Sequence, residues 1–280
     1  MKRNFLLIFL ISIILFLLAC NLGQPSPTSV AVQPTVAIET PTNAVSEIPT
    51  STSGNNFVIP QGLATGATPS SIPASLDPNA PFWDIHPAYI EIALDGYILQ
   101  NTFHQPKIFI YPADEFAKVN EGAAEIIARM QELLANQNAP MPENMPFMPL
   151  FNAGQVFHSN EQFLTFQNGT GVRFLTQFAQ APYPANNHDL FYTFQGLTSN
   201  GAYYVSAILP INAAFLSADG NPETSLPADG VPFDWNNFEN VPAHFELVKQ
   251  KLNATDPNAF TPSLTNLDAL IQSMLITGTP

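Results

Sequence analysis

The sequence predicts an α+β fold: a mostly antiparallel sheet of two or more hairpins, with a long helix in the first half of the chain and two helices at its C-terminal end. Two pairs of apolar runs flank glycine-containing turns, as the strands of hairpins do. One stretch in the first half and two near the C-terminus repeat apolar residues at helical spacing. Strands and helices that are segregated along the chain favour α+β over an alternating α/β architecture.

The first strands are predicted after residue 80. Residues 90–94 and 97–99 are rich in branched and aromatic side chains and flank the turn-prone pair Asp95-Gly96. A further apolar run, 107–111, is stopped by a proline. The sequence therefore predicts strands on both sides of this turn and one more strand after them.

A long helix is predicted from Asp114, whose carboxylate is suited to cap its first turn. Glu125 precedes Arg129 by four residues, a spacing that brings opposite charges together on one helix face. The apolar residues that recur at helical spacing are Phe116, Val119, Ala123, Ile126, Ile127, Met130, Leu133 and Leu134.

Residues 140–149 contain four prolines, which predict an extended loop outside helix and sheet. Met141, Met145 and Met148 lie in this loop, and thioethers are soft ligands suited to copper(I). The alternative is that these flexible side chains fill an irregular gap beneath the loop, and we favour it. No metal site is therefore predicted here.

Two hairpins are predicted to form the centre of the sheet. In the second hairpin, alternate residues on both faces are apolar, so both faces should be covered by other parts of the chain. The predicted strands are 163–167 and 172–178, joined by 168–171, and 190–197 and 203–209, joined by 198–201.

Two helices are predicted near the C-terminus, each with a proline expected in its first turn. Pro242 precedes one apolar series, Pro262 precedes the other, and Gly278 follows the second series. The two series are Phe245, Val248 and Leu252, and Leu264, Leu267, Leu270, Ile271, Met274 and Leu275.

The N-terminal residues 1–19 have the pattern of a signal peptide. Lys2 and Arg3 precede the run 5–18, which is apolar except for Ser12, and Ala19 supplies the small residue before a cleavage point. Residues 17–20, Leu-Leu-Ala-Cys, resemble the lipobox of bacterial lipoproteins. The resemblance implies that Cys20, the only cysteine, becomes the lipid-modified first residue of a mature protein anchored to a membrane outside the cytoplasm.

Two other interpretations of this N-terminal segment fit its pattern less well. A signal anchor that remains as a transmembrane helix needs about 20 apolar residues, and run 5–18 is shorter. An ordinary secretory signal would leave Cys20 as a free thiol on an exported protein. The lipoprotein interpretation is therefore preferred.

The remainder of the chain divides by composition near residue 80. Residues 20–79 are rich in proline, serine and threonine and predict a lipidated, disordered tether. The apolar patch 57–59 within it leaves open whether part of the tether docks on the domain. Residues 80–280 are predicted to form a single globular domain, whose element order is similar to that of the Mog1/PsbP-like group, some of whose members are extracytoplasmic lipoproteins.

Charge and cysteine usage exclude several classes of function. The formal net charge is −14, and the basic residues outside the signal are scattered, so nucleic-acid binding is not expected. A single cysteine excludes an intrachain disulfide, a cysteine-based zinc site and thiol catalysis within the domain. The 22 phenylalanines and 7 tyrosines supply the material for an apolar core instead.

Catalytic motifs give no positive signal. The chain contains no nucleophile elbow, phosphate-binding loop, paired zinc histidines or dinucleotide fingerprint, and no cofactor is predicted. Histidines near acids could form an acid/base or metal centre, but local hydrogen bonding is the preferred interpretation. The histidines are His86, His104, His158, His188 and His244, and the acids are Asp84, Glu161, Asp189 and Glu246.

Aromatic residues offer a binding alternative. They would line a groove for glycans or apolar ligands if one sheet face were open, although aromatic residues on strands more often belong to a core. Loop 181–189 is a further candidate, because rigid strands hold its polar residues between two hairpins. The aromatic residues in question are Phe163, Phe166, Phe174, Phe178, Tyr192, Phe194, Tyr203 and Tyr204.

The function predicted from these patterns is that of a membrane-anchored extracytoplasmic lipoprotein that binds an envelope protein, a glycan or a small apolar ligand, and that is not an enzyme. The alternative is a hydrolase-like envelope enzyme that uses carboxylates and a histidine from the loops. A solute receptor of a transporter is disfavoured, because such receptors usually have two lobes.

Replacing Cys20 with Ala is expected to prevent lipidation and leave the protein as an uncleaved or freely soluble precursor. Mass spectrometry of the wild-type protein should find an acylated Cys20 at the mature N-terminus. An unmodified cysteine, or a mature protein that retains residues 5–18, would contradict the lipoprotein interpretation.

Overall fold

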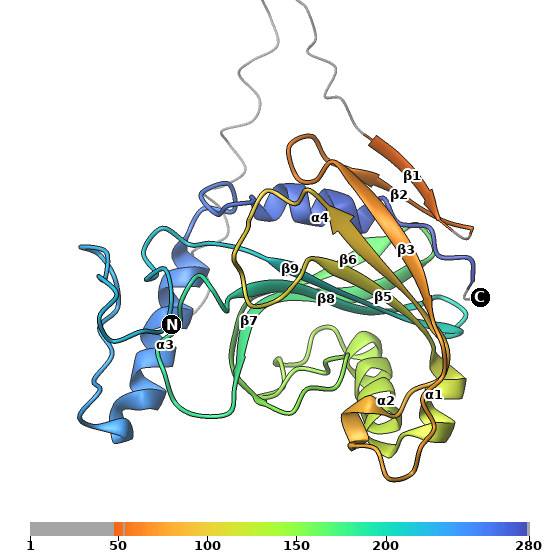
Figure 1. Cartoon of the computed structure of the whole chain (residues 1–280), viewed down its shortest axis with the longest axis horizontal. Coiled ribbons are helices and arrows are strands. Elements are labelled where there is room, and N and C mark those ends of the chain that lie inside the picture. Colours follow the sequence, from red (N-terminus) through yellow and green to blue (C-terminus); the bar gives the residue numbers. More distant parts are fainter. Residues whose placement is uncertain (1–47, 53, 279–280) are drawn as a thin grey trace, which may run out of the picture. The chain divides into compact units, whose positions relative to one another are not determined.

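A seven-stranded antiparallel sheet organises the part of the chain that the computed structural model describes, residues 48–52 and 54–278 (Figure 1). Its strand order is β3-β4-β5-β9-β8-β7-β6, and a two-stranded sheet pairs β1 with β2. The strands are β1 (Ile48–Thr52), β2 (Asn55–Ile59), β3 (Gly66–Ile72), β4 (Tyr89–Asp95), β5 (Lys107–Pro112), β6 (Gly154–Phe166), β7 (Gly169–Ala179), β8 (Phe191–Thr198) and β9 (Tyr203–Pro210).

Helices cover both faces of the large sheet, and the predicted α+β class is confirmed. The helices are α1 (Ala113–Val119), α2 (Glu121–Ala135), α3 (Val241–Ala254) and α4 (Leu264–Gln272), with short 3₁₀ turns η1 (Phe82–Asp84) and η2 (Phe238–Asn240). None of these helices is long and apolar enough to cross a bilayer. The predicted signal peptide and Cys20 lie outside the described residues.

Two apolar clusters form, one on each face of the sheet. In Figure 1, α1 and α2 lie on one side of the sheet, and α4 with the β1–β2 pair lies on the other. The first cluster includes Phe116 and Met130 from the helices and Phe191 from β8. The second includes Leu267 from α4 and Phe194 from β8. Because Phe191 and Phe194 point to opposite faces and are both buried, neither face of β8 is open to solvent.

The hairpin of β8 and β9 lies near the middle of the sheet, as predicted. Its turn places Gly201 at φ 72°, a left-handed conformation that disfavours residues with a Cβ. The other predicted hairpin, β6 and β7, lies at the edge instead. Its connection is Gln167-Asn168, and Gly171 belongs to β7, where a Cβ would lie 2.3 Å from the carbonyl oxygen of Gln195.

The long helix predicted from Asp114 is interrupted, and Asp114 does not cap it. Asn120 is extended (φ −145°, ψ 115°), and its side-chain oxygen accepts a hydrogen bond from the Ala123 N–H at 3.1 Å. Its amide donates to the carbonyl of Phe82 at 2.7 Å, which ties the break to η1. Asn120 therefore ends α1 and caps α2. The predicted pair Glu125–Arg129 is present at 4.0 Å.

The predicted strand at 97–99 is absent. After β4 the chain turns at Gly96, and Tyr97 is buried with its hydroxyl donating to the carbonyl of Pro210 at 2.9 Å. This long-range contact draws the segment away from β4, whose neighbours are β3 and β5. The strand predicted at 107–111 is β5.

Both predicted C-terminal helices are present, but the second differs in its bounds: Pro262 precedes the cap of α4 instead of lying in its first turn, and Met274 and Leu275 follow its end, where Leu275 forms a bridge with Asn56. Pro242 lies in the first turn of α3, and Phe245, Val248 and Leu252 are buried. Helix α4 is capped by Ser263, whose hydroxyl accepts from the Asn266 N–H at 3.2 Å.

The predicted boundary between tether and domain at residue 80 is wrong, because residues 48–72 contribute strands to the fold. Strand β3 pairs with β4 along its whole length, and Phe57 and Ile59 of β2 are buried against the α4 side. Asn56 and Leu275 exchange backbone hydrogen bonds of 3.0 and 2.7 Å. The composition of residues 20–79 concealed these strands. Only every second residue of β2 is buried, so a strand can form in a segment that is otherwise polar.

Replacing Phe57 with Ala is expected to cost about 3–5 kcal/mol of unfolding free energy, since it removes a buried aromatic ring. Phe82 is 54% exposed and serves as the matched control, for which Phe82→Ala should cost less than about 0.5 kcal/mol. Urea denaturation of the two variants measures the difference. Equal, small effects would mean that residues 48–72 are dispensable, as a tether would be.

Candidate functional site

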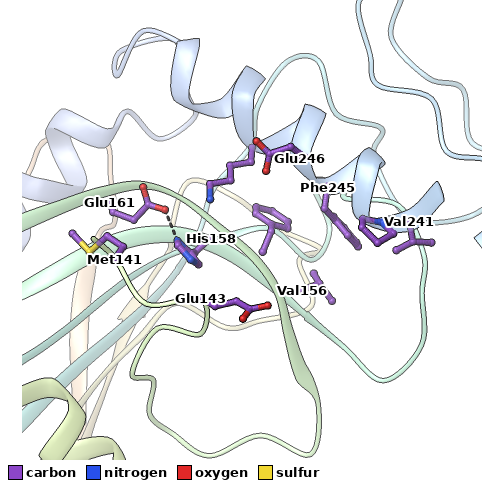
Figure 2. Close-up of a pocket in the computed structure, with 11 residues that line it drawn as sticks. Met141, Glu143, Val156, His158, Glu161, Val241, Phe245 and Glu246 are labelled. Carbon is purple, nitrogen blue, oxygen red and sulfur yellow. Dashed lines mark hydrogen bonds and ion pairs between the residues drawn. The ribbon is translucent and has the colours of Figure 1, made fainter. Parts of the chain in front are cut away.

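A cleft of about 720 Å³ runs beside the edge strand β6 (Figure 2). Strand β6 forms its base, helix α3 forms one wall, and loop 140–149 forms the other. The volume lies within the range of about 300–1,000 Å³ that is typical of small-molecule sites. The cleft is therefore the candidate ligand-binding site.

An irregularity in β6 brings His158 and Glu161 together. The register with β7 shifts between Ser159 and Gln162, and Asn160 adopts a positive φ of 54°. The Asn160 N–H donates to the side-chain oxygen of Asn253 on α3 at 2.6 Å. In a regular strand, residues three apart point to opposite faces, so the bulge is what allows His158 to bond Glu161.

His158 and Glu161 form a partly buried hydrogen-bonded pair inside the cleft (Figure 2). Burial raises the pKa of Glu161, but the hydrogen bond from His158, its own backbone N–H and the charge of Lys249 outweigh this, so the pKa lies below its ordinary value. Glu161 is therefore ionised at neutral pH. The ionised carboxylate accepts the hydrogen bond, so Nδ1 of His158 carries the proton.

The floor of the cleft is apolar and its rim is acidic. Phe157 of β6 stacks on Phe245 of α3, with ring centroids 5.7 Å apart and planes at 26°. Glu143 of the loop and Glu246 of α3 are exposed at the rim, and Lys249 is the lysine of the lining. Val156, Val241 and Pro242 complete the apolar surface.

The loop wall is held to the sheet by the side chain of Gln195. Its amide oxygen accepts from the Met148 N–H at 3.0 Å, and its NH₂ donates to the Met148 carbonyl at 2.9 Å. The hydroxyls of Ser206 and Tyr204 complete this buried network by donating to the Met148 carbonyl and to the Gln195 oxygen, at 2.5 and 2.9 Å. We call these contacts the Gln195 clamp.

The lining limits the chemistry that the cleft can perform. No serine, threonine, cysteine or tyrosine of the described residues lines it, so it holds no hydroxyl or thiol nucleophile. The pair His158–Glu161 has the arrangement of a general base oriented by a carboxylate. Within residues 48–52 and 54–278, no three histidine, cysteine or acidic side chains gather as a metal site would require.

The three methionines of the proline-rich loop do not share one site, which removes the copper(I) alternative to gap filling. Met145 and Met148 are buried in the apolar cluster on the α2 face, whereas Met141 lines the cleft. Filling of the space beneath the proline-rich loop is thus the role of Met145 and Met148.

The other histidines have local partners or pack against aromatic rings. His188 bonds Asp189 at 3.0 Å, and His86 bonds the carbonyl of its neighbour Pro87 at 2.9 Å. His244 links the carbonyl of Pro232 (2.9 Å) to the N–H of Ala185 (3.3 Å). Of the predicted histidine–acid pairs, only the ones at 158/161 and 188/189 are in contact among the described residues.

The core interpretation, which the sequence favoured over an aromatic groove on an open sheet face, is confirmed for four of the aromatic residues in question. Phe174 and Tyr204 belong to the cluster on one face, and Tyr192 and Phe194 to the cluster on the other, all of them buried. Phe178 of the same set lines a cavity that is separate from the cleft.

Sequence reasoning missed Glu143, Phe157, Phe245 and Lys249 as site residues. Nothing in their local sequence marks them, because three separate elements bring them together. The three-residue spacing of His158 and Glu161 can be read from the sequence, but the two side chains meet only because of the bulge in β6. Comparison of the chain with models of known protein families, with curated proteins and with solved structures found no match.

Replacing Glu161 with Gln is expected to destabilise the domain at neutral pH and to have little effect at about pH 3. Because folding lowers the pKa of Glu161, its contribution is present above the ordinary glutamate pKa and is lost as the pH falls through the folded value. Hydrogen bonds to charged groups contribute about 1.5–3 kcal/mol, which solvent screening reduces here to about 1 kcal/mol.

Urea unfolding at both pH values measures this effect. Glu115→Gln, which alters an exposed carboxylate on α1, is the control and should change the free energy of unfolding by less than about 0.5 kcal/mol. If the free energy of unfolding of Glu161→Gln matched that of the wild type at neutral pH, the hydrogen bond between His158 and Glu161 would contribute nothing to stability.

Proposed function

We propose that this chain is a lipid-anchored extracytoplasmic binding protein whose domain takes a small amphipathic ligand with a cationic group in the cleft beside β6. The observation that carries the proposal is the composition of the cleft: an apolar floor with a rim of carboxylates. The anchor would be the lipid on Cys20, which the lipobox-like sequence suggests.

The floor favours a ligand with an apolar body. Phe157 and Phe245 stack on each other with their edges lining the cleft, and Val156, Val241 and Pro242 add aliphatic surface. Small-molecule sites are typically lined in this way, with a few polar groups that orient the ligand. A purely polar ligand would leave this surface without a partner.

The rim favours a positive charge on that ligand. Glu143 and Glu246 face the cleft without a cation paired to either within the described residues, while Glu161 is paired with His158. Lys249 offsets one of these charges, and the chain as a whole carries −14. A field of this sign attracts cations and repels anions.

A second candidate function is hydrolysis or another acid/base reaction at His158. It is favoured by the orientation of this imidazole by Glu161, as in a general base. It would have to proceed by activation of water, since no hydroxyl or thiol nucleophile lines the cleft among the described residues. Binding alone requires no such step and is the preferred proposal.

The proposal is tested by titrating the full-length protein, solubilised in detergent, with 1-naphthylmethylamine and with 1-naphthylacetic acid, which share an apolar body and differ in charge. The amine is expected to bind with saturation and the acid more weakly. Glu246→Gln and Glu143→Gln should each weaken amine binding about two- to fivefold, as expected for partly solvated charges.

Glu115→Gln serves as the control and should bind the amine like the wild type. Equal affinity for the amine and the acid, or retention of full affinity in both cleft variants, would contradict the proposal. Hydrolysis of 1-naphthyl acetate that is lost in His158→Gln would support the second candidate instead.

A further inference from the structure

A second cavity, of about 450 Å³, lies apart from the cleft and shares no residue with it. Its lining comes from three segments distant in sequence: residues 103–104, residues 151–153 and the end of β7 with the loop after it, 178–183. We call it the aromatic cavity, because Phe103, Phe151, Phe178 and Tyr183 line it together with His104.

The aromatic rings of the cavity pack against one another. His104 stacks on Phe151, with centroids 5.3 Å apart and planes at 13°, and it meets Phe191 edge-on at 4.5 Å. Phe178 packs against Phe151 at 5.2 Å. These rings are partly buried, whereas Phe103 is 66% exposed, so its ring offers an apolar surface beside the cavity.

His104 supplies the imidazole of the aromatic cavity. Neither nitrogen of its ring makes a hydrogen bond to the described part of the chain, although the ring lies against two phenylalanines. Burial lowers its pKa to about 4, with the charge of Asp189 opposing this effect and that of His188 adding to it. A neutral imidazole offers one donor and one acceptor, which match a hydroxyl group.

The cavity carries no formal charge, in contrast to the cleft. Among the described residues, its lining contains no aspartate, glutamate, lysine or arginine. Its polar groups are uncharged at neutral pH: the amides of Asn152 and Gln180, the imidazole of His104 and the hydroxyl of Tyr183, whose pKa burial and Asp189 raise to about 12. In a chain of net charge −14, this composition favours an uncharged ligand.

We propose that the aromatic cavity binds a neutral saccharide. The C–H face of a sugar ring suits the ring of Phe103, and its hydroxyls suit His104, Asn152 and Gln180, each of which can both donate and accept. A hydrocarbon ligand would leave both nitrogens of His104 without partners, and a charged ligand would find no counter-charge in the lining. The saccharide could be a free sugar or the end of a glycan chain.

The test uses the full-length protein in detergent and two sets of probes. Free glucose, galactose, mannose and N-acetylglucosamine are titrated by saturation-transfer NMR, and soluble neutral polysaccharides built from them are titrated by calorimetry. Saturable binding in either set supports the proposal. Tighter binding of the free sugars would indicate a free sugar as the ligand, and tighter binding of the polysaccharides would indicate the end of a glycan chain. Phe103→Ala and His104→Phe should each weaken binding at least fivefold.

His104→Phe keeps an aromatic ring for stacking and removes only the nitrogens. Phe82→Ala, which removes another exposed phenylalanine outside the lining, should leave binding unchanged. Thermal melting of each variant establishes that the fold is retained. The proposal is overturned if no neutral sugar or polysaccharide binds with saturation, if both cavity variants bind like the wild type, or if benzyl alcohol binds more tightly than every sugar.

Discussion

The side chain of Gln195 holds together the parts of the molecule on which both candidate sites depend. It projects from β8, the strand buried on both faces, and engages the N–H and the carbonyl of Met148 at once. Segment 140–153 contains four prolines and no helix or strand, so it has few backbone partners of its own. Buried polar groups left without partners cost about 1–3 kcal/mol each, which explains why Gln195, Tyr204 and Ser206 are arranged to satisfy one another. The Gln195 clamp thus converts a proline-rich loop into a fixed wall.

The same wall serves two cavities of opposite character. Its first part, with Met141 and Glu143, closes the cleft beside β6, and its last part, residues 151–153, closes the aromatic cavity. The cleft collects carboxylates around an apolar floor, whereas the aromatic cavity excludes formal charge and keeps a neutral imidazole. A net charge of −14 distributed so unevenly gives the two cavities different ligand preferences.

Local signals in the sequence were sufficient for the centre of the fold and insufficient for its edges and sites. The Asn200-Gly201 turn and the alternation along β8 and β9 specify a hairpin by short-range rules, and Pro242 marks α3 in the same way. The break at Asn120 depends on the distant carbonyl of Phe82, and β2 depends on Leu275, more than 200 residues away, so neither could be read locally. The meeting of His158 and Glu161 required a bulge that is fixed by Asn253 of α3. Long-range partners of this kind leave no periodicity in the sequence.

The most direct test of this account is the hydrogen-exchange rate of the Met148 amide in the native protein. Exchange protection measures the free energy of the opening that breaks a hydrogen bond. If the Gln195 clamp fixes the wall, Met148 should be protected to a degree close to that of the amides of β8, despite lying in a loop without regular structure. Exchange of Met148 as fast as that of an exposed loop amide would show that the wall is open in solution and that neither cavity is preformed.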